Sequence, residues 1–128
     1  MNDIDIKNWL ISLRSCNIEA EAIRNEIAYL QKNMPMCVEW RIAELQKKLE
    51  QIAGQKALMG KIAENITDPI ARSIFSLRYI SDCTWIVVAQ KCGRMSERNA
   101  HYIHDKYLPE FERLYRKVVL GNEEGSGG

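Results

Sequence analysis

Apolar residues recur at alternating intervals of three and four along the first half of the chain, and this spacing restricts the fold more than any other feature. The first series comprises Ile6, Trp9, Leu13, Cys16, Ala20, Ile23, Ile27, Leu30 and Met34. The second comprises Val38, Ile42, Leu45, Leu49, Ile52, Lys56, Met59, Ala63 and Ile66. Such alternation is typical of a helix that turns one apolar stripe toward a partner helix, as in a coiled coil. The two series predict two helices of about 30 residues, each about 45 Å long.

Pro35 separates the two series. The residue before a proline is biased away from helical dihedrals, and a short connection favours antiparallel neighbours. We therefore predict an all-α fold in which residues 1–66 form a long antiparallel coiled-coil hairpin. Gly54 and Gly60 each weaken the second helix by about 1 kcal/mol relative to alanine and permit a bend. Lys56 either specifies register or packs its stem while its ammonium group reaches water, and we favour the second interpretation.

The second predicted helix is apolar over a wider face than one partner helix needs. The additional apolar residues are Ala43, Ala53, Ala57, Leu58 and Ile62. Such a face suits either the C-terminal half of the chain or a second copy. Because apolar surface left over after folding favours self-association, we expect a homodimer.

The composition is that of an ordinary soluble protein. The 128 residues are 46% hydrophobic and 27% charged, which suits one domain or a domain with an extension. The sequence has no apolar run of the roughly 18 residues that a membrane span needs, and its acidic start lacks the features of a signal peptide. We therefore expect a cytoplasmic protein with no membrane partner.

The sequence contains no arrangement of residues typical of a catalytic, cofactor or metal site. It has no nucleophile–histidine–carboxylate pattern and no glycine-rich phosphate loop. The four cysteines are Cys16, Cys37, Cys83 and Cys92. They form no CxxC pair, and His101 and His104 complete no zinc spacing with them. We interpret the cysteines as reduced residues at small apolar positions, and we expect no enzymatic activity, no cofactor and no metal.

Residues 67–120 predict a compact set of shorter helices. Asp68 followed by Pro69 marks a helix start, and apolar residues at 70, 74, 77, 79 and 80 continue that helix to Ile80. Thr84 is a good N-cap for the next helix, which Gly93 ends in a left-handed conformation. The inward-facing residues of that helix are Trp85, Val88, Ala89 and Cys92.

Ser96 caps a further helix. Its buried side carries Ala100, Ile103 and Tyr107, and Met95 reaches back into the core. Pro109 is predicted to start a last helix, with Phe111, Leu114 and Val118 spaced for one face. Residues 121–128, GNEEGSGG, cannot form a core, and we expect them to be disordered.

The two helices around Gly93 are typical of a helix–turn–helix, in which the second helix offers its N-terminal residues to a major groove about 12 Å wide. At about 100° per residue, Arg98, His101, Tyr102 and Asp105 point away from the buried side. Residues 68–120 carry nine Lys or Arg and six Asp or Glu, which permits a nucleic-acid partner. Each candidate can also be an ordinary solvated residue. The candidate DNA-binding residues are Thr84, Lys91, Arg94, Ser96, Glu97, Arg98, Asn99, His101, Tyr102 and Lys106.

Residues 77–114 resemble the region-four helix–turn–helix of bacterial sigma factors and, more closely, the small ArpU-like regulators of phages. The matching residues are Leu77, Arg78, Tyr79, Ile80, Thr84, Trp85, Val88, Ala89, Gly93, Ser96, Glu97, Arg98, Ile103, His104 and Leu108. Between Gly93 and Ser96 this chain has two residues where the family usually has one. The resemblance implies a sigma region-four-like domain at 67–120 that binds double-stranded DNA in a bacterial host cell and controls phage transcription, with RNA polymerase as a further partner.

Two other functions fit the same pattern. Small terminase subunits, which recognise phage DNA for packaging, also join a helix–turn–helix to helical oligomerisation segments, and they form closed rings where a regulator forms a dimer. Alternatively, the basic corner binds RNA polymerase or a host protein instead of DNA. Salt-dependent duplex binding separates this last function from the first two.

Overall fold

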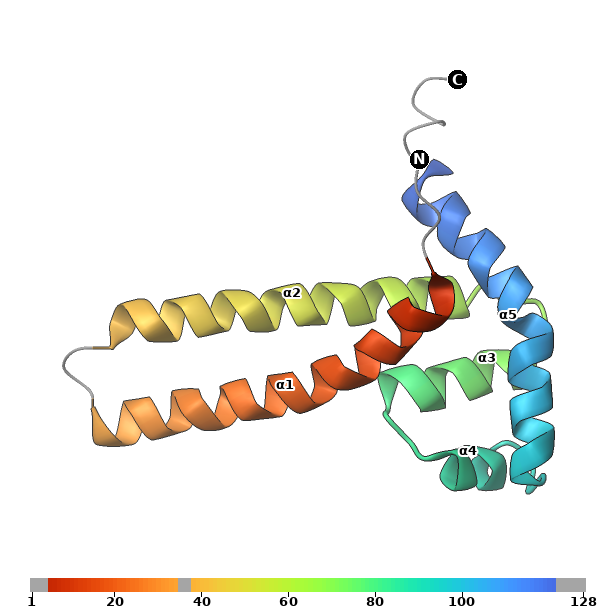
Figure 1. Ribbon diagram of the computed structural model, residues 1–128, viewed down its shortest axis with the longest axis horizontal. Coiled ribbons are helices and arrows are strands. Elements are labelled where there is room, and N and C mark those ends of the chain that lie inside the picture. Colours follow the sequence, from red (N-terminus) through yellow and green to blue (C-terminus); the bar gives the residue numbers. More distant parts are fainter. Residues whose placement is uncertain (1–4, 35–37, 122–128) are drawn as a thin grey trace. The chain divides into compact units, whose positions relative to one another are not determined.

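The computed structural model describes residues 5–34 and 38–121, and within these ranges all regular secondary structure is helical. The elements are α1 (Ile6–Asn33), α2 (Glu39–Ala63), α3 (Pro69–Phe75), the π-helical turn η1 (Ser76–Ile80), α4 (Trp85–Lys91) and α5 (Glu97–Val119) (Figure 1). This confirms the predicted all-α class. The chain divides into two compact units, one ending at Ala57 and the other starting at Leu58. The predicted connection at Pro35 lies outside the described residues. Of the segment 121–128 predicted to be disordered, Gly121 is helical and half-buried, and residues 122–128 lie outside the described residues.

Helix α1 begins and ends where its sequence provides caps. The Asp5 carboxylate accepts hydrogen bonds from the backbone N–H groups of Lys7 and Asn8, at 3.1 and 3.3 Å. These bonds satisfy donors that have no partner within the first turn of a helix. At the other end, the N–H of Met34 donates to the Leu30 carbonyl, and Met34 is exposed rather than packed with the other members of its series.

In the first unit, α1 and α2 run side by side in opposite directions (Figure 1). Three side-chain pairs show the register. The Trp9 Nε1–H donates to the Gln55 Oε1 at 3.0 Å, the Lys56 ammonium donates to the Asn17 side-chain oxygen, and the Arg41 Nε–H donates to Glu26 at 3.0 Å. The core between the helices consists of residues from the two predicted series: Ala20, Ile23, Leu45 and Ile52, with Cys16, Ile27, Leu30 and Leu49 packed around them.

Lys56 is half-buried, and its ammonium group donates a hydrogen bond to the side-chain oxygen of Asn17 on the facing helix, a partner that the sequence did not predict. The Asn17 Nδ2 is the buried side-chain polar atom in the described residues that has no hydrogen-bond partner. Helix α2 is continuous through Gly54 and Gly60, so neither glycine ends it.

The second unit is built around two stacked phenylalanine rings. Phe75 of α3 lies parallel to Phe111 of α5, with ring centroids 5.0 Å apart and 3° between the planes, and both side chains are fully buried. Asp68 caps α3 by accepting from the Ala71 N–H at 2.9 Å, and Pro69 lies in the first turn, which confirms the predicted helix start.

The helix predicted to continue to Ile80 is present, but it changes type along its length. The α-helical part ends at Phe75, and the chain then widens into the π-helical turn η1. Its buried residues are Ala71, Ile74, Phe75 and Tyr79, whereas Ile70 is 44% exposed. Apolar residues surround this short helix, so their spacing fits more than one face. The face that buries the Phe75 ring removes the most apolar surface from water and prevails.

Pro109 does not start a helix, contrary to the prediction. It lies inside α5, which is one helix from Glu97 to Val119. The buried residues of α5 continue along one face on both sides of the proline: Ala100, His104, Leu108, Phe111 and Tyr115. Pro109 itself is exposed. The loss of one backbone hydrogen bond at a proline therefore falls on the solvent side, and packing on the opposite side keeps the two halves in line.

Candidate nucleic-acid interface

Both helices of the candidate interface begin at predicted caps. The Thr84 hydroxyl accepts from the Val87 N–H at 3.4 Å, and the Ser96 hydroxyl accepts from the Asn99 N–H at 3.0 Å. Both residues have the extended backbone that an N-cap requires. The starts of α4 and α5 are thereby fixed by short polar residues whose positions are readable in the sequence.

The turn between α4 and α5 contains two consecutive residues in the left-handed region. Gly93 has a φ of 100°, as predicted for the residue that ends α4, and Arg94 follows with a φ of 57°. A left-handed conformation is uncommon for arginine. It is held by two backbone bonds: Arg94 N–H donates to the Gln90 carbonyl at 3.2 Å, and Met95 N–H donates to the Ala89 carbonyl at 3.0 Å. The chain therefore passes from α4 to α5 through two successive left-handed residues.

The inner side of this helix pair is apolar. A cluster of Ile74, Val88 and Cys92 is surrounded by Leu77, Cys83, Trp85, Met95 and Ile103. The cluster thus joins α3, α4, the turn and α5. Ala100 is fully buried, while Ile103 and Tyr107 are half-buried. Helix α5 is therefore supported on one side, which leaves its opposite side for solvent.

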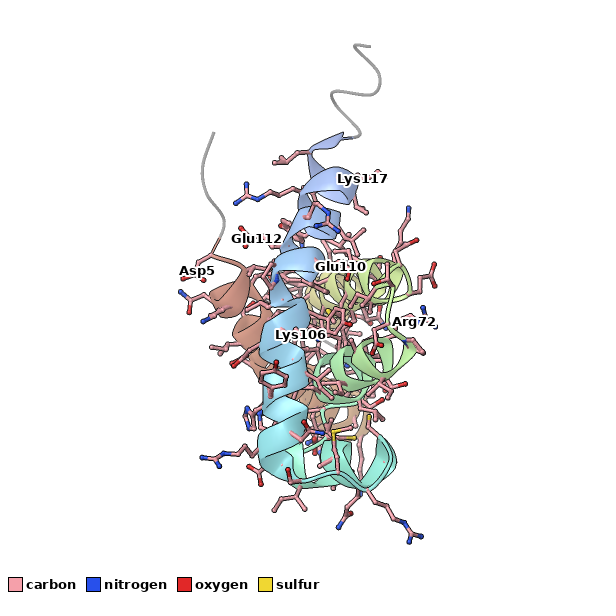
Figure 2. The ribbon with its side chains drawn as sticks, turned by 90° about the vertical axis from the view of Figure 1, so that its right-hand side faces the viewer. Asp5, Arg72, Lys106, Glu110, Glu112 and Lys117 are labelled. Atoms are coloured by element: carbon pink, nitrogen blue, oxygen red, sulfur yellow. The ribbon has the colours of Figure 1, made fainter. Side chains whose placement is uncertain are left out.

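Nine of the ten candidate DNA-binding residues are exposed. They are Thr84, Lys91, Arg94, Ser96, Glu97, Arg98, Asn99, Tyr102 and Lys106. Tyr102 is 63% exposed, which is unusual for a large aromatic side chain in a small protein. Lys106 projects from the middle of α5 (Figure 2), and its Nζ lies 5.8 Å from the centre of the neighbouring Tyr107 ring. Arg98, Tyr102 and Lys106 are four residues apart, so they lie along one line of the helix.

The sequence predicted that His101 points freely outward, but the structure places its ring against an aromatic neighbour. Its ring lies against the Trp85 ring, with centroids 3.9 Å apart, and its Nε2 is 3.9 Å from a Glu97 carboxylate oxygen. Arg78 covers Trp85 as well, with its guanidinium carbon 4.7 Å from the ring centre, and donates to the Cys83 carbonyl at 3.1 Å. His101 therefore helps to hold α5 on α4, although 44% of its side chain remains exposed.

Sequence reasoning missed a buried polar cluster below this surface. His104 is 7% exposed and lies between Tyr79 and Asp105. Its Nε2 is 2.8 Å from the Tyr79 hydroxyl, and its Nδ1 is 2.9 Å from an Asp105 carboxylate oxygen. A carboxylate can only accept, so Nδ1 carries the proton and Nε2 accepts from the tyrosine. The Asp105 side chain is 71% exposed, so it lies on the outward side as predicted, and it also accepts a hydrogen bond from His104.

Burial lowers the pKa of His104 below the usual value for histidine, although the Asp105 carboxylate opposes this effect. The Phe75 ring stacks on His104 at 4.7 Å, and Trp85 meets it edge-on at 5.3 Å. The imidazole is consequently neutral at neutral pH and belongs to the core. A signal for this role existed in the sequence, because His104 is four residues from both Ala100 and Leu108 and falls on their buried face.

The cysteines and the metal-binding side chains form no further site among the described residues. Cys16, Cys83 and Cys92 are free thiols, and burial raises the pKa of Cys92. Cys37 lies outside the described residues. Within residues 5–34 and 38–121, no three His, Cys, Asp or Glu side chains are grouped as a metal ion would require.

Comparison with known proteins adds no relative: no family model, no curated protein and no solved structure matches the chain. In the part of the chain that the structure describes, none of the helices is both long enough and apolar enough to cross a membrane.

Proposed function

We propose that the chain is a sequence-specific, double-stranded DNA-binding regulator of phage transcription, in which α4 and α5 act as a sigma region-four-like helix–turn–helix that follows a helical hairpin. The observation that carries the proposal is the contrast between the two sides of α5. One side packs on α3 and α4, and the other presents Arg98, Tyr102 and Lys106 to solvent. A helix so held can enter a major groove with its first turns.

The chemistry of the exposed line suits a duplex. Arg98 is the second residue of α5, where the fork of an arginine can reach two acceptors of guanine or one phosphate. Asn99 offers a side-chain amide to adenine, and in the unbound chain the nitrogen of this amide donates to the Met95 sulfur at 3.7 Å. Lys91 and Arg94, both exposed at the turn, add positive charge toward the phosphates on the flank. The proposal assigns His101 a supporting role, because it stacks on Trp85.

The test compares Arg98→Ala with Arg24→Ala. Both arginines are exposed on helices, but Arg24 lies on α1, outside the proposed interface. Duplexes selected from a random pool by the wild-type chain provide the ligand. We expect Arg98→Ala to weaken binding to the selected duplex by about 5- to 150-fold, the equivalent of about 1–3 kcal/mol, and to relax preference at one base pair. Arg24→Ala should bind as the wild type does. Equal binding by both variants would show that the recognition helix is wrongly assigned.

Salt dependence tests the lysines separately. Lys91→Gln should lower affinity for all duplexes alike and reduce the slope of log affinity against log salt by about one. A binding constant that does not change with salt would favour a protein partner such as RNA polymerase. Ile86 on α4 is 59% exposed, and this apolar side chain at the surface is the observation that favours a protein partner as the second candidate. A closed ring of many copies would instead favour DNA packaging.

A further inference from the structure

Helix α1 carries a second apolar stripe, on the side that faces away from α2. Ile11 is 61% exposed, Ile18 is 73% exposed and Tyr29 is 60% exposed, and Ala22 is exposed between them. With about 3.6 residues per turn, these four positions lie within a narrow arc whose centre is about 160° from the centre of the stripe that packs on α2. The stripe is therefore additional to the helix pair, and nothing in the first unit covers it.

The spacing of this stripe is the same in both directions. From Ile11 the intervals are seven to Ile18, four to Ala22 and seven to Tyr29. A two-fold axis perpendicular to a helix reverses the helix direction, so an interface with this symmetry requires a surface that matches its own reverse. An axis level with residue 20 brings Ile11 opposite Tyr29 of a second copy and Ile18 opposite its Ala22.

The polar positions in the stripe obey the same symmetry. Ser15 and Asn25 lie between the apolar residues, both are exposed, and both are five residues from the level of the axis. Antiparallel contact therefore pairs serine with asparagine, as it pairs apolar with apolar residues. A parallel arrangement instead puts Ile18 on Ile18 and Asn25 on Asn25, which fits the unequal sizes of Ile18 and Ala22 less well.

We propose that the exposed stripe of α1 is a homodimer interface in which two α1 helices pack antiparallel. The stripe has three large side chains, each about three-fifths exposed or more. Counted in both copies, they contribute on the order of 700 Å² of buried surface. The residues along their flanks extend this area toward the roughly 1,000 Å² of a specific interface. The dimer is accordingly one that forms and dissociates with concentration. This inference does not depend on DNA binding and is measured without DNA.

Two exposed alanines of α1 provide a matched test. Ala22 lies in the stripe, and Ala28 lies about 100° away from its centre. Sedimentation equilibrium of the full chain should give twice the mass of one chain for the wild type at high concentration. Ala22→Glu should raise the dimer dissociation constant at least tenfold, since it places two carboxylates in the contact. Ala28→Glu should leave the dissociation constant unchanged. Circular dichroism of both variants should match the wild type.

Orientation is tested by mixing two single-cysteine additions. A mixture of Ile11→Cys and Tyr29→Cys chains should form a disulfide cross-link beyond that seen with wild type or with either variant alone. A wild-type chain that stays monomeric, an equal effect of the two glutamate substitutions, a closed ring of copies, or preferential cross-linking of Ile11→Cys to itself would each overturn the proposal.

Discussion

The Tyr79 hydroxyl provides the sharpest stability test, because it donates a hydrogen bond to a buried histidine. Tyr79→Phe leaves the shape of the ring almost unchanged and removes the hydrogen bond to the Nε2 of His104, which is 7% exposed. A buried acceptor without a partner costs about 1–3 kcal/mol. For a unit of this size, each kcal/mol lowers Tm by roughly 4–8 °C. The assay is thermal and urea unfolding monitored by circular dichroism.

Tyr102→Phe is the matched control, because Tyr102 is 63% exposed and its hydroxyl can bond to water. We expect this control to change the free energy of unfolding by no more than about 0.5 kcal/mol. If Tyr79→Phe and Tyr102→Phe proved equally stable, the account of His104 as a buried acceptor of the tyrosine hydrogen bond would be refuted.

The same cluster gives the stability of the fold a pH dependence of defined sign. Burial lowers the pKa of His104 in the folded chain, so the unfolded chain binds this proton more readily. The contribution of His104 is therefore complete above the ordinary histidine pKa of about 6.5 and is lost as the pH falls below it. His104→Leu removes the group that titrates. The free-energy difference between wild type and His104→Leu should be constant above about pH 7 and should shift against the wild type toward pH 5. A flat difference would contradict this reasoning.

Two further predictions concern the backbone and the helix pair. A Cβ at Gly54 meets nothing within 4 Å, so Gly54→Ala should stabilise the fold by about 0.5–1 kcal/mol in urea unfolding, whereas Gly93→Ala should destabilise it because Gly93 has a φ of 100°. Lys56→Met leaves the Asn17 amide oxygen without its donor and should lower the free energy of unfolding by about 1–3 kcal/mol. The double variant Asn17→Leu, Lys56→Met should recover most of that loss. If the effects of the two substitutions were strictly additive, a direct pair would be contradicted.

Sequence predicted most reliably what depends on local chemistry. The caps at Asp68, Thr84 and Ser96 and the left-handed Gly93 follow from the properties of single residues, and each is found as predicted. The alternating series also predicted the residues of the core between α1 and α2, because a heptad pattern has a unique face.

Predictions failed where packing between distant segments outweighs local preference. Pro109 has the strongest local signal for a boundary, yet one buried face continues past it from Leu108 to Phe111. His101 sits on the outward side by helical angle, but the Trp85 ring extends far enough to cover part of it. The periodicity of a single helix does not show how far an aromatic side chain reaches or which residues of other helices it contacts.

The unbroken course of α5 has a mechanical consequence for the second unit. Glu110 lies just past the proline and is labelled in Figure 2. Its carboxylate accepts from both the backbone N–H and the hydroxyl of Thr67, at 3.0 and 3.1 Å, and Thr67 belongs to the segment that joins α2 to α3. Because these two bonds join α5 to the backbone at Thr67, a tilt of α5 displaces the segment between α2 and α3.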